Sequence, residues 1–150
     1  MEEITVNSLG FLLDRALWTL SSTLNATLKE KGIDLPHSQY IIMRFLDEKE
    51  GISQNKLAIL LHKDAAAIKR SIDNLEKKGL LIRKALSERK NGIYLTDKGK
   101  ALIPKVKTIA DEILGGTFGQ TEEMRHTCIL FLESIYKYYA EKGILQQSDI

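Results

Sequence analysis

One ordered pattern of helix caps, apolar faces and turn residues runs through residues 52–96, and it restricts the possible folds more than any other feature of the chain. Ser53 is a favourable N-cap for a short helix that ends near Leu61, and Asp64 is a favourable N-cap for a second helix that ends at Gly79. The second helix has an apolar face at spacings of four and three residues, formed by Ile68, Ile72 and Leu75. Two capped helices joined by a tight turn predict a helix-turn-helix.

A β-hairpin is expected directly after the two helices. Two β-type runs, 80–86 and 93–96, flank a polar segment with the sequence Ser87-Glu88-Arg89-Lys90-Asn91-Gly92. Asn-Gly is the strongest short-range hairpin signal, so the turn is expected at residues 91 and 92. A helix-turn-helix followed by a hairpin with a basic tip predicts a winged-helix lobe.

Longer helices are predicted on both sides of this lobe. The first spans about residues 6–31, and its apolar stripe consists of Leu9, Leu13, Ala16, Leu20, Leu24 and Leu28. A second helix follows Pro36, Thr96 caps another that ends where the glycine-rich segment 115–119 breaks the chain, and the last covers about residues 121–142. At a rise of roughly 1.5 Å per residue the first helix is nearly 40 Å long. That length indicates that it packs against a second copy of the chain.

The positive charge of the chain is concentrated in its centre. Residues 51–105 hold thirteen Lys or Arg and five Asp or Glu, a local charge of +8. Since the whole chain sums to +2, the remaining residues sum to −6. A basic centre between acidic arms is the electrostatic pattern of a surface that binds phosphate groups.

The outward face of the second helix of the helix-turn-helix is the candidate for reading DNA bases. This helix lies in the major groove in known helix-turn-helix complexes, and its outward residues here are Ala65, Ala66, Lys69, Arg70 and Asp73. The alanines let the backbone approach the groove floor, and Lys69 and Arg70 reach furthest toward the bases. A bidentate Arg–guanine contact is the commonest specific one. Candidate phosphate contacts are Ser53, Gln54, Asn55 and Lys63.

Each of these features alone also has an ordinary explanation. Lys69 and Arg70 would suit a solvated helix face, and Arg89 and Lys90 would suit a soluble turn. The conjunction of two capped helices, a terminating glycine and a basic hairpin within a segment of charge +8 favours DNA binding. The alternative is a winged-helix module that docks a protein partner without specific DNA binding, and a steep salt dependence of binding to duplex would separate the two.

Three runs of the sequence are specific when they occur together. They are Ser53-Gln54-Asn55-Lys56-Leu57-Ala58, Ile72-Asp73-Asn74-Leu75-Glu76-Lys77-Lys78-Gly79-Leu80-Leu81-Ile82-Arg83 and Ile93-Tyr94-Leu95-Thr96-Asp97-Lys98-Gly99. With the long first helix and the two closing helices, this chain resembles the MarR family of winged-helix transcription regulators over nearly its whole length.

The resemblance implies a mainly α fold with a small β-hairpin wing, in a single domain over residues 1–150. Residues 1–35 and 105–150 are expected to supply the dimerisation helices, and residues 36–104 the winged helix-turn-helix lobe. It further implies a homodimer that holds two lobes over a pseudo-palindromic operator in double-stranded DNA and represses nearby genes.

The resemblance also implies a role for the wing. Arg89, beside Lys90, is expected to enter the minor groove. Two positions depart from the family pattern. Ser87 stands where an aspartate commonly braces the wing arginine, with Glu88 beside it, and Lys69 stands where the recognition helix often carries threonine. The operator sequence therefore cannot be taken from relatives.

Members of that family often bind small aromatic or anionic ligands between the DNA-binding lobe and the dimer helices, and such a ligand would relieve repression. The candidate lining residues here are Trp18, His37, Tyr40, Met43 and Arg44. The alternative, which the residues themselves favour, is that these are ordinary core and boundary positions.

Other kinds of site find little support in the sequence. Cys128 lies within an expected helix among apolar residues and has no second cysteine, so a redox role is disfavoured. His37, His62 and His126 are far apart in sequence, so neither a metal site nor a cofactor is predicted. No glycine-rich phosphate loop, nucleophile motif or acid/base dyad is visible, and an enzyme is not expected.

The expected location is the cytoplasm. No run approaches about eighteen consecutive apolar residues, so no association with a membrane is predicted. The start, Met1-Glu2-Glu3-Ile4, lacks the basic and apolar regions of a signal peptide. One cysteine fits a reducing compartment.

Overall fold

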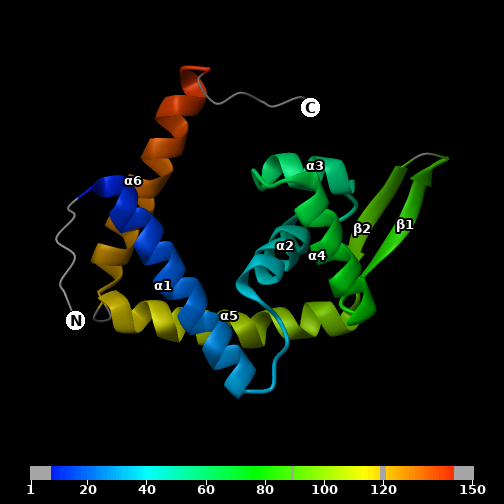
Figure 1. Ribbon diagram of the computed structural model, residues 1–150, viewed down its shortest axis with the longest axis horizontal. Coiled ribbons are helices and arrows are strands. Elements are labelled where there is room, and N and C mark those ends of the chain that lie inside the picture. Colours follow the sequence, from blue (N-terminus) through cyan, green and yellow to red (C-terminus); the bar gives the residue numbers. More distant parts are fainter. Residues whose placement is uncertain (1–7, 89, 119–120, 144–150) are drawn as a thin grey trace.

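The computed structural model describes residues 8–88, 90–118 and 121–143, and these form six helices and one two-stranded antiparallel sheet (Figure 1). In chain order the elements are α1 (Leu9–Glu30), α2 (His37–Glu48), α3 (Gln54–Leu60), α4 (Ala65–Lys77), β1 (Leu81–Ser87), β2 (Lys90–Leu95), α5 (Asp97–Phe118) and α6 (Glu122–Glu141). The predicted fold class, mainly helical with a small hairpin after a helix-turn-helix, is confirmed.

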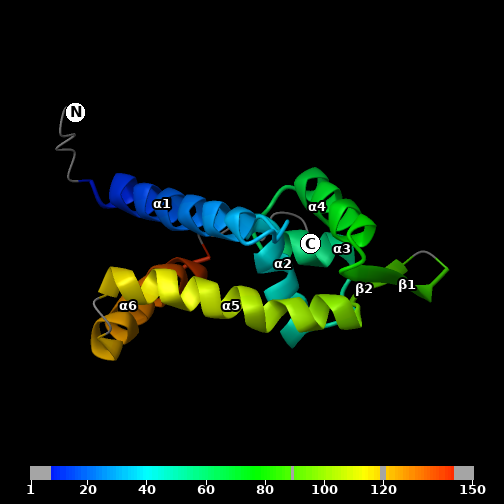
Figure 2. The same ribbon diagram turned by 90° about the horizontal axis from the view of Figure 1, so that it is seen from below.

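The molecule has two differently built parts. Helices α2, α3 and α4, the hairpin and the first half of α5 form a lobe, whereas α1, the second half of α5 and α6 form an open arm beside it (Figures 1 and 2). Helices α1 and α5 pack against each other, and α5 continues from under the lobe into the arm. None of the described helices is both long and apolar enough to cross a membrane.

The helix-turn-helix forms as its caps predict. The Ser53 hydroxyl accepts a hydrogen bond from the Lys56 amide at 3.3 Å, and the Asp64 carboxylate accepts one from the Ala67 amide at 3.0 Å. Gly79 ends α4 with a φ of +72°, a left-handed conformation that suits glycine. The expected inward face of α4 is confirmed, because it is buried in a core shared with α2, α3 and the hairpin; its members are Ile68, Ile72 and Leu75.

The position of the hairpin turn differs from the prediction. Residues 91 and 92 lie inside β2, where Asn91 pairs with Ala85 and Gly92 with Lys84, and the strands are instead connected between Ser87 and Lys90. Arg89 itself lies outside the described residues. The expectation of an Asn-Gly turn was therefore wrong, although the hairpin itself is present.

Gly92 lies where two backbone segments approach each other closely, rather than in a turn. A Cβ at this position would lie 3.0 Å from the Gly51 carbonyl oxygen and equally close to the Leu86 side chain. The segment before α3 runs along β2 there: the Gly51 amide donates to the Ile93 carbonyl at 2.8 Å, and the Ile93 amide donates to the Ile52 carbonyl at 3.0 Å. The wing is thus tied to the start of the helix-turn-helix.

The Leu-Thr-Asp-Lys-Gly segment joins the wing, α4 and α5. The Thr96 hydroxyl donates to the Gly79 carbonyl at 2.6 Å and accepts from the Gly99 amide at 3.1 Å. A Cβ at Gly99 would lie only 2.1 Å from the Leu80 carbonyl oxygen, which no side chain can tolerate without a shift of the backbone. Glycine is required here because α5 crosses the start of β1 at contact distance.

The arm helices also depart from expectation in one place. Helix α5 continues through Gly115 and Gly116 to Phe118, so the chain break expected at residues 115–119 was placed too early. A glycine within a helix costs only about 1 kcal/mol relative to alanine, which hydrogen bonding along the helix can outweigh. Residues 119 and 120, where α5 gives way to α6, lie outside the described part.

Candidate nucleic-acid interface

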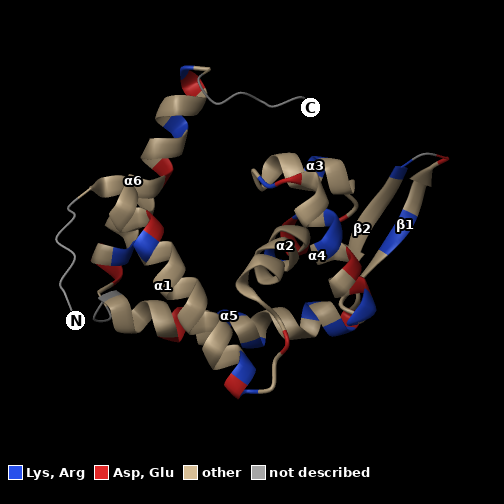
Figure 3. Ribbon diagram, in the orientation of Figure 1, with Lys and Arg blue, Asp and Glu red and all other residues tan. Residues whose placement is uncertain are grey.

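The N-terminal half of α4 presents a narrow, charged front to solvent. Four of the five candidate base-reading residues are exposed and the fifth, Asp73, is half-buried; the exposed four are Ala65, Ala66, Lys69 and Arg70. Basic residues also lie on both strands of the hairpin and at the start of α5, in the same part of the molecule (Figure 3). The structure therefore gathers these candidate side chains on one helix beside the wing.

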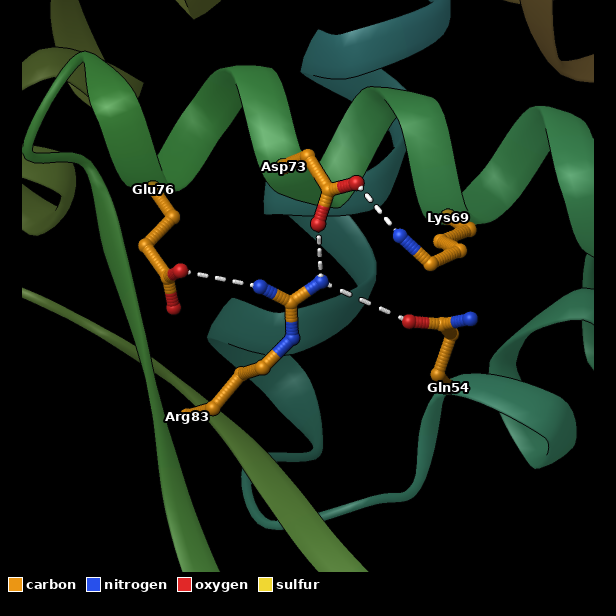
Figure 4. Close-up of polar contacts among 5 residues, drawn as sticks. All are labelled: Gln54, Lys69, Asp73, Glu76 and Arg83. Atoms are coloured by element: carbon orange, nitrogen blue, oxygen red, sulfur yellow. Dashed lines mark hydrogen bonds and ion pairs between the residues drawn. The ribbon is translucent and has the colours of Figure 1, made fainter.

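Arg83 on β1 is the centre of a polar network beneath this front (Figure 4). Its guanidinium donates to the Asp73 carboxylate at 2.5 Å and to the Glu76 carboxylate at 2.9 Å. It also reaches the Gln54 side-chain oxygen at 3.5 Å. One partly buried side chain thereby connects α3, α4 and β1, the three elements that would have to keep a fixed geometry on DNA.

Asp73 receives a second cation from its own helix. Lys69 Nζ lies 2.8 Å from Asp73 Oδ2, one helical turn away, while Arg83 binds Oδ1. Hydrogen bonds from Lys69 and then Arg83 hold the pKa of Asp73 below its usual value, so the carboxylate is charged at neutral pH. From the sequence, Arg83 was expected only as part of the basic segment, and its partners were missed, because no signal in the sequence alone joins β1 to α4.

A polar hollow of about 320 Å³ lies between the start of α3 and the hairpin. Three of the candidate phosphate contacts, Ser53, Gln54 and Asn55, line this hollow together with the candidate wing residue Lys90. The other lining residues are Arg83, Asn91 and Ile93. Hydroxyl, amide and cationic groups facing one hollow are the groups that bind a DNA phosphate. Asn91 was predicted as a turn residue, and its place on the wall of this hollow was missed.

Lys63, the fourth candidate phosphate contact, does not line this hollow. It is exposed in the turn between α3 and α4. Burial is the larger cause of the lowered pKa of His37 at the start of α2, and the positive charge of Lys63 lowers that pKa further. The imidazole of His37 is therefore held neutral at neutral pH.

A second, more apolar cavity of about 170 Å³ lies between α1, α2 and α5. Of the five candidate ligand residues it brings together His37 and Tyr40; the other lining residues are Leu20, Leu24, Ala110, Ile113 and Leu114. Trp18, Met43 and Arg44 do not line it. Met43 is fully buried in the lobe core, Arg44 is half-buried on α2, and Trp18 is 68% exposed on α1. The α5 residues were missed because their meeting with α2 is a tertiary contact.

The arm helices expose large apolar side chains. On α1 these include Leu9, Leu17 and Trp18, and on α6 they include Met124, Ile129, Leu130, Phe131, Leu132, Tyr136, Tyr138 and Tyr139. No residue of α6 is buried, and Cys128 is half-buried on the same helix. An exposed apolar surface of this kind marks an interaction site.

Within the described residues no group of three His, Cys, Asp or Glu side chains is placed to hold a metal ion.

The MarR family model matches residues 35–90, which run from just before α2 to the first residue of β2. The HTH-type transcriptional regulator TtmR of Methylorubrum extorquens (strain PA1) is 30% identical over 104 residues, which are 68% of this chain and 53% of TtmR. The chain therefore spans about half the length of that relative. Both the family and this relative are transcriptional regulators rather than enzymes.

Solved structures of similar fold cover most of the chain. A MarR-family transcriptional regulator from Rhodococcus sp. RHA1 superposes with a TM-score of 0.78 at 26% identity, covering 89% of this chain and 96% of its own. CouR from Rhodococcus jostii RHA1, solved with p-coumaroyl-CoA bound, has a TM-score of 0.75 at 26% identity and covers 89% of this chain and 95% of its own. The similarity therefore includes the arm helices as well as the lobe.

Proposed function

Because the chain belongs to the MarR family of transcriptional regulators, we propose that it is a homodimeric repressor that binds operator DNA through α3, α4 and the hairpin. The observation that carries this proposal is the meeting of the slim, basic front of α4 with the polar hollow beside the wing. The first suits a major groove and the second a backbone phosphate.

In this proposal the position of each residue determines which part of the DNA it contacts. Lys69 and Arg70 reach the base edges, with Ala65 and Ala66 allowing the close approach and Asp73 beside them. Phosphates are bound by the side chains around the hollow and by the neighbouring turn; these are Ser53, Gln54, Asn55, Lys63 and Lys90. Arg89, outside the described residues, is proposed as the minor-groove contact.

The exposed apolar faces of α1 and α6 support the homodimer. Trp18 on α1 and Phe131 on α6 are 68% and 46% exposed in the single chain. A second copy that covers these faces would place two identical lobes side by side, and the target would then be a pseudo-palindromic operator. We propose that binding there represses nearby genes, which locates the protein in the cytoplasm with the chromosome.

The cavity between α1, α2 and α5 supports control by a small ligand. Its volume of about 170 Å³ is below the range of about 300–1,000 Å³ typical of drug-sized ligands, so it suits a single ring. The Tyr40 hydroxyl and the neutral His37 imidazole would supply polar contacts within apolar walls. CouR, which is similar in fold, binds an aromatic acyl-CoA. We propose a small aromatic or anionic ligand whose binding relieves repression.

The salt dependence of binding tests this function. Fluorescence anisotropy with duplex fragments from the region around the gene should show binding at low salt whose affinity falls steeply as salt rises, since several phosphates are contacted. Affinity for one fragment should exceed that for a scrambled duplex of equal length. Absence of salt-sensitive binding to any duplex would contradict the proposal and would favour a winged-helix protein–protein module.

A further inference from the structure

The front of α4 carries a donor and an acceptor held next to each other. Lys69 Nζ and Asp73 Oδ2 are 2.8 Å apart, and their side chains are 63% and 36% exposed. Figure 4 shows both side chains on the side of α4 that also faces Arg83 and Gln54, and Lys69 belongs to the exposed front that the proposed function places in the major groove. The pair is electrically neutral, so it adds little attraction for phosphates.

Asp73, the acceptor of this pair, is held in place by a second cation. Arg83 donates to Asp73 Oδ1, and Arg83 is itself held by Glu76 and Gln54. Asp73 Oδ2 is left to bind Lys69, the more exposed member of the pair. A charged carboxylate has about four lone-pair sites, so Asp73 can accept a further hydrogen bond while both cations stay in place. Little side-chain entropy would be lost when such a pre-arranged group meets its target.

The major-groove edge of a G·C base pair has the complementary arrangement. Guanine O6 accepts and cytosine N4 donates, and the Watson–Crick bond that joins these two atoms sets them about 2.9 Å apart. The lysine donor and the aspartate acceptor have nearly the same separation. The ion pair can therefore contact both bases without breaking.

A T·A pair shares the central acceptor and donor but differs on both sides. On the lysine side guanine offers a second acceptor, N7, where thymine carries a methyl group. On the aspartate side adenine N7 would oppose the carboxylate, and cytosine has no acceptor there. C·G and A·T pairs present the donor to the lysine and are excluded directly.

We propose that Lys69 and Asp73 act as one unit that reads a single G·C base pair in each half-site, with Lys69 donating to guanine O6 and N7 and Asp73 accepting from cytosine N4. This inference rests on the proposed function, because it assumes that α4 enters the major groove. It deepens that function by naming a specificity-determining pair and the base pair that it selects.

The chain contains a matched control. Lys107 and Asp111 form a second Lys–Asp ion pair at the same helical spacing, with both side chains about half exposed, but on α5. Substitutions there change the same charges in an ion pair of the same spacing and lie outside the front of α4; unlike Asp73, Asp111 is paired with its lysine and not also with an arginine. Asp111→Asn is therefore the control for Asp73→Asn, and Lys107→Met the control for Lys69→Met.

The test is selection of binding sites from a random duplex pool, followed by sequencing, with the full chain and these four variants. The wild type should select a G·C pair at one fixed distance on each side of the symmetry centre. Asp73→Asn should lower the preference for that pair about tenfold or more and admit T·A, because an asparagine amide matches adenine N6 and N7. Lys69→Met should lose the preference for guanine at the same position.

Affinity for random duplex gives an independent readout. Asp73→Asn removes one negative charge, so its non-specific binding at low salt should be unchanged or tighter. A merely structural role for Asp73 would instead weaken binding to every sequence. Lys69→Met provides the second route, since its exposed side chain can be shortened without disturbing the core.

Two results would overturn this inference while leaving the proposed function standing. One is equal weakening of Asp73→Asn on all duplexes; the other is a selected site with no G·C pair that responds to either substitution. Failure of the wild type to show any salt-sensitive DNA binding would overturn both proposals. Both α5 control variants are expected to select the wild-type site.

Discussion

The lobe buries its apolar side chains within one chain, whereas the arm leaves many of its apolar side chains exposed. In the lobe the apolar faces of α2, α3, α4 and the hairpin meet one another, and residues such as Leu57, Ile72 and Leu75 are fully enclosed. In the arm α6 has no buried residue, and Leu130 and Phe131 are exposed. One chain therefore encloses the apolar side chains of the lobe, whereas those of the arm stay exposed in the single chain and form the surface that the proposed homodimer would cover.

The largest expected effect concerns the closed core of the lobe. Leu75→Ala should lower the free energy of unfolding by about 2–5 kcal/mol, because Leu75 has no exposed surface and truncation leaves a cavity. Urea denaturation measures this difference. Leu86→Ala, at a half-exposed leucine of the wing, should stay within about 0.5 kcal/mol of the wild type. Equal effects at both positions would break the distinction between enclosed and open apolar residues.

The next effect concerns the open face of the arm. Phe131→Glu should weaken the dimer by about thirtyfold or more, as expected for a charge placed at a buried aromatic contact of an interface. Sedimentation equilibrium measures the dissociation constant, and circular dichroism should show that the helices persist. Lys137→Gln, an exposed polar position on the same helix, is the control. A dimer of unchanged strength in Phe131→Glu would place the interface elsewhere.

A smaller effect is expected where α4 meets the wing. Arg83→Met should lower affinity for the selected operator about tenfold, because Asp73 and Glu76 lose their shared cation and repel the phosphates. Lys84→Met changes the same charge on the adjacent residue of β1 and should have less effect. The additional substitution Glu76→Gln should restore part of the lost affinity. No difference between the two methionine variants would show that only net charge matters.

The smallest effect is a dependence of stability on pH through His37. Burial and, to a lesser degree, Lys63 lower the pKa of its imidazole in the folded chain, so below the ordinary pKa of 6.5 the unfolded chain binds more protons. The contribution of neutral His37 is complete above that value and is lost as the pH falls toward the folded pKa. His37→Gln should reduce the difference in unfolding free energy between about pH 7.5 and pH 5.5. An unchanged difference would show that other groups cause it.

The lobe was predictable from sequence where its signals are local. The caps at Ser53 and Asp64 and the inward spacing of Ile68, Ile72 and Leu75 act within one helix, and each is found as expected. The Asn-Gly turn failed because residues 51 and 52 pair with β2 and draw Gly92 into the strand. A contact between distant segments overrode a strong local preference.

The same reasoning explains what was missed at the candidate site. The sequence places Lys69 and Asp73 on one helix face, and the structure shows them paired. Arg83 lies ten residues beyond Asp73 on a strand, and only the folded lobe brings its guanidinium to that carboxylate. The α5 wall of the apolar cavity likewise depends on how α5 packs under α2.

In the proposed function, a self-contained lobe reads DNA, while an arm completed by a second copy holds two lobes at a fixed spacing. Hydroxyl-radical and methylation footprinting on the selected operator test it most directly. We expect two symmetric protected segments whose centres lie one helical turn, about 10 base pairs, or a multiple of it apart, with two chains bound per duplex. Protection of a single half-site by one chain, or protection without a symmetry centre, would contradict it.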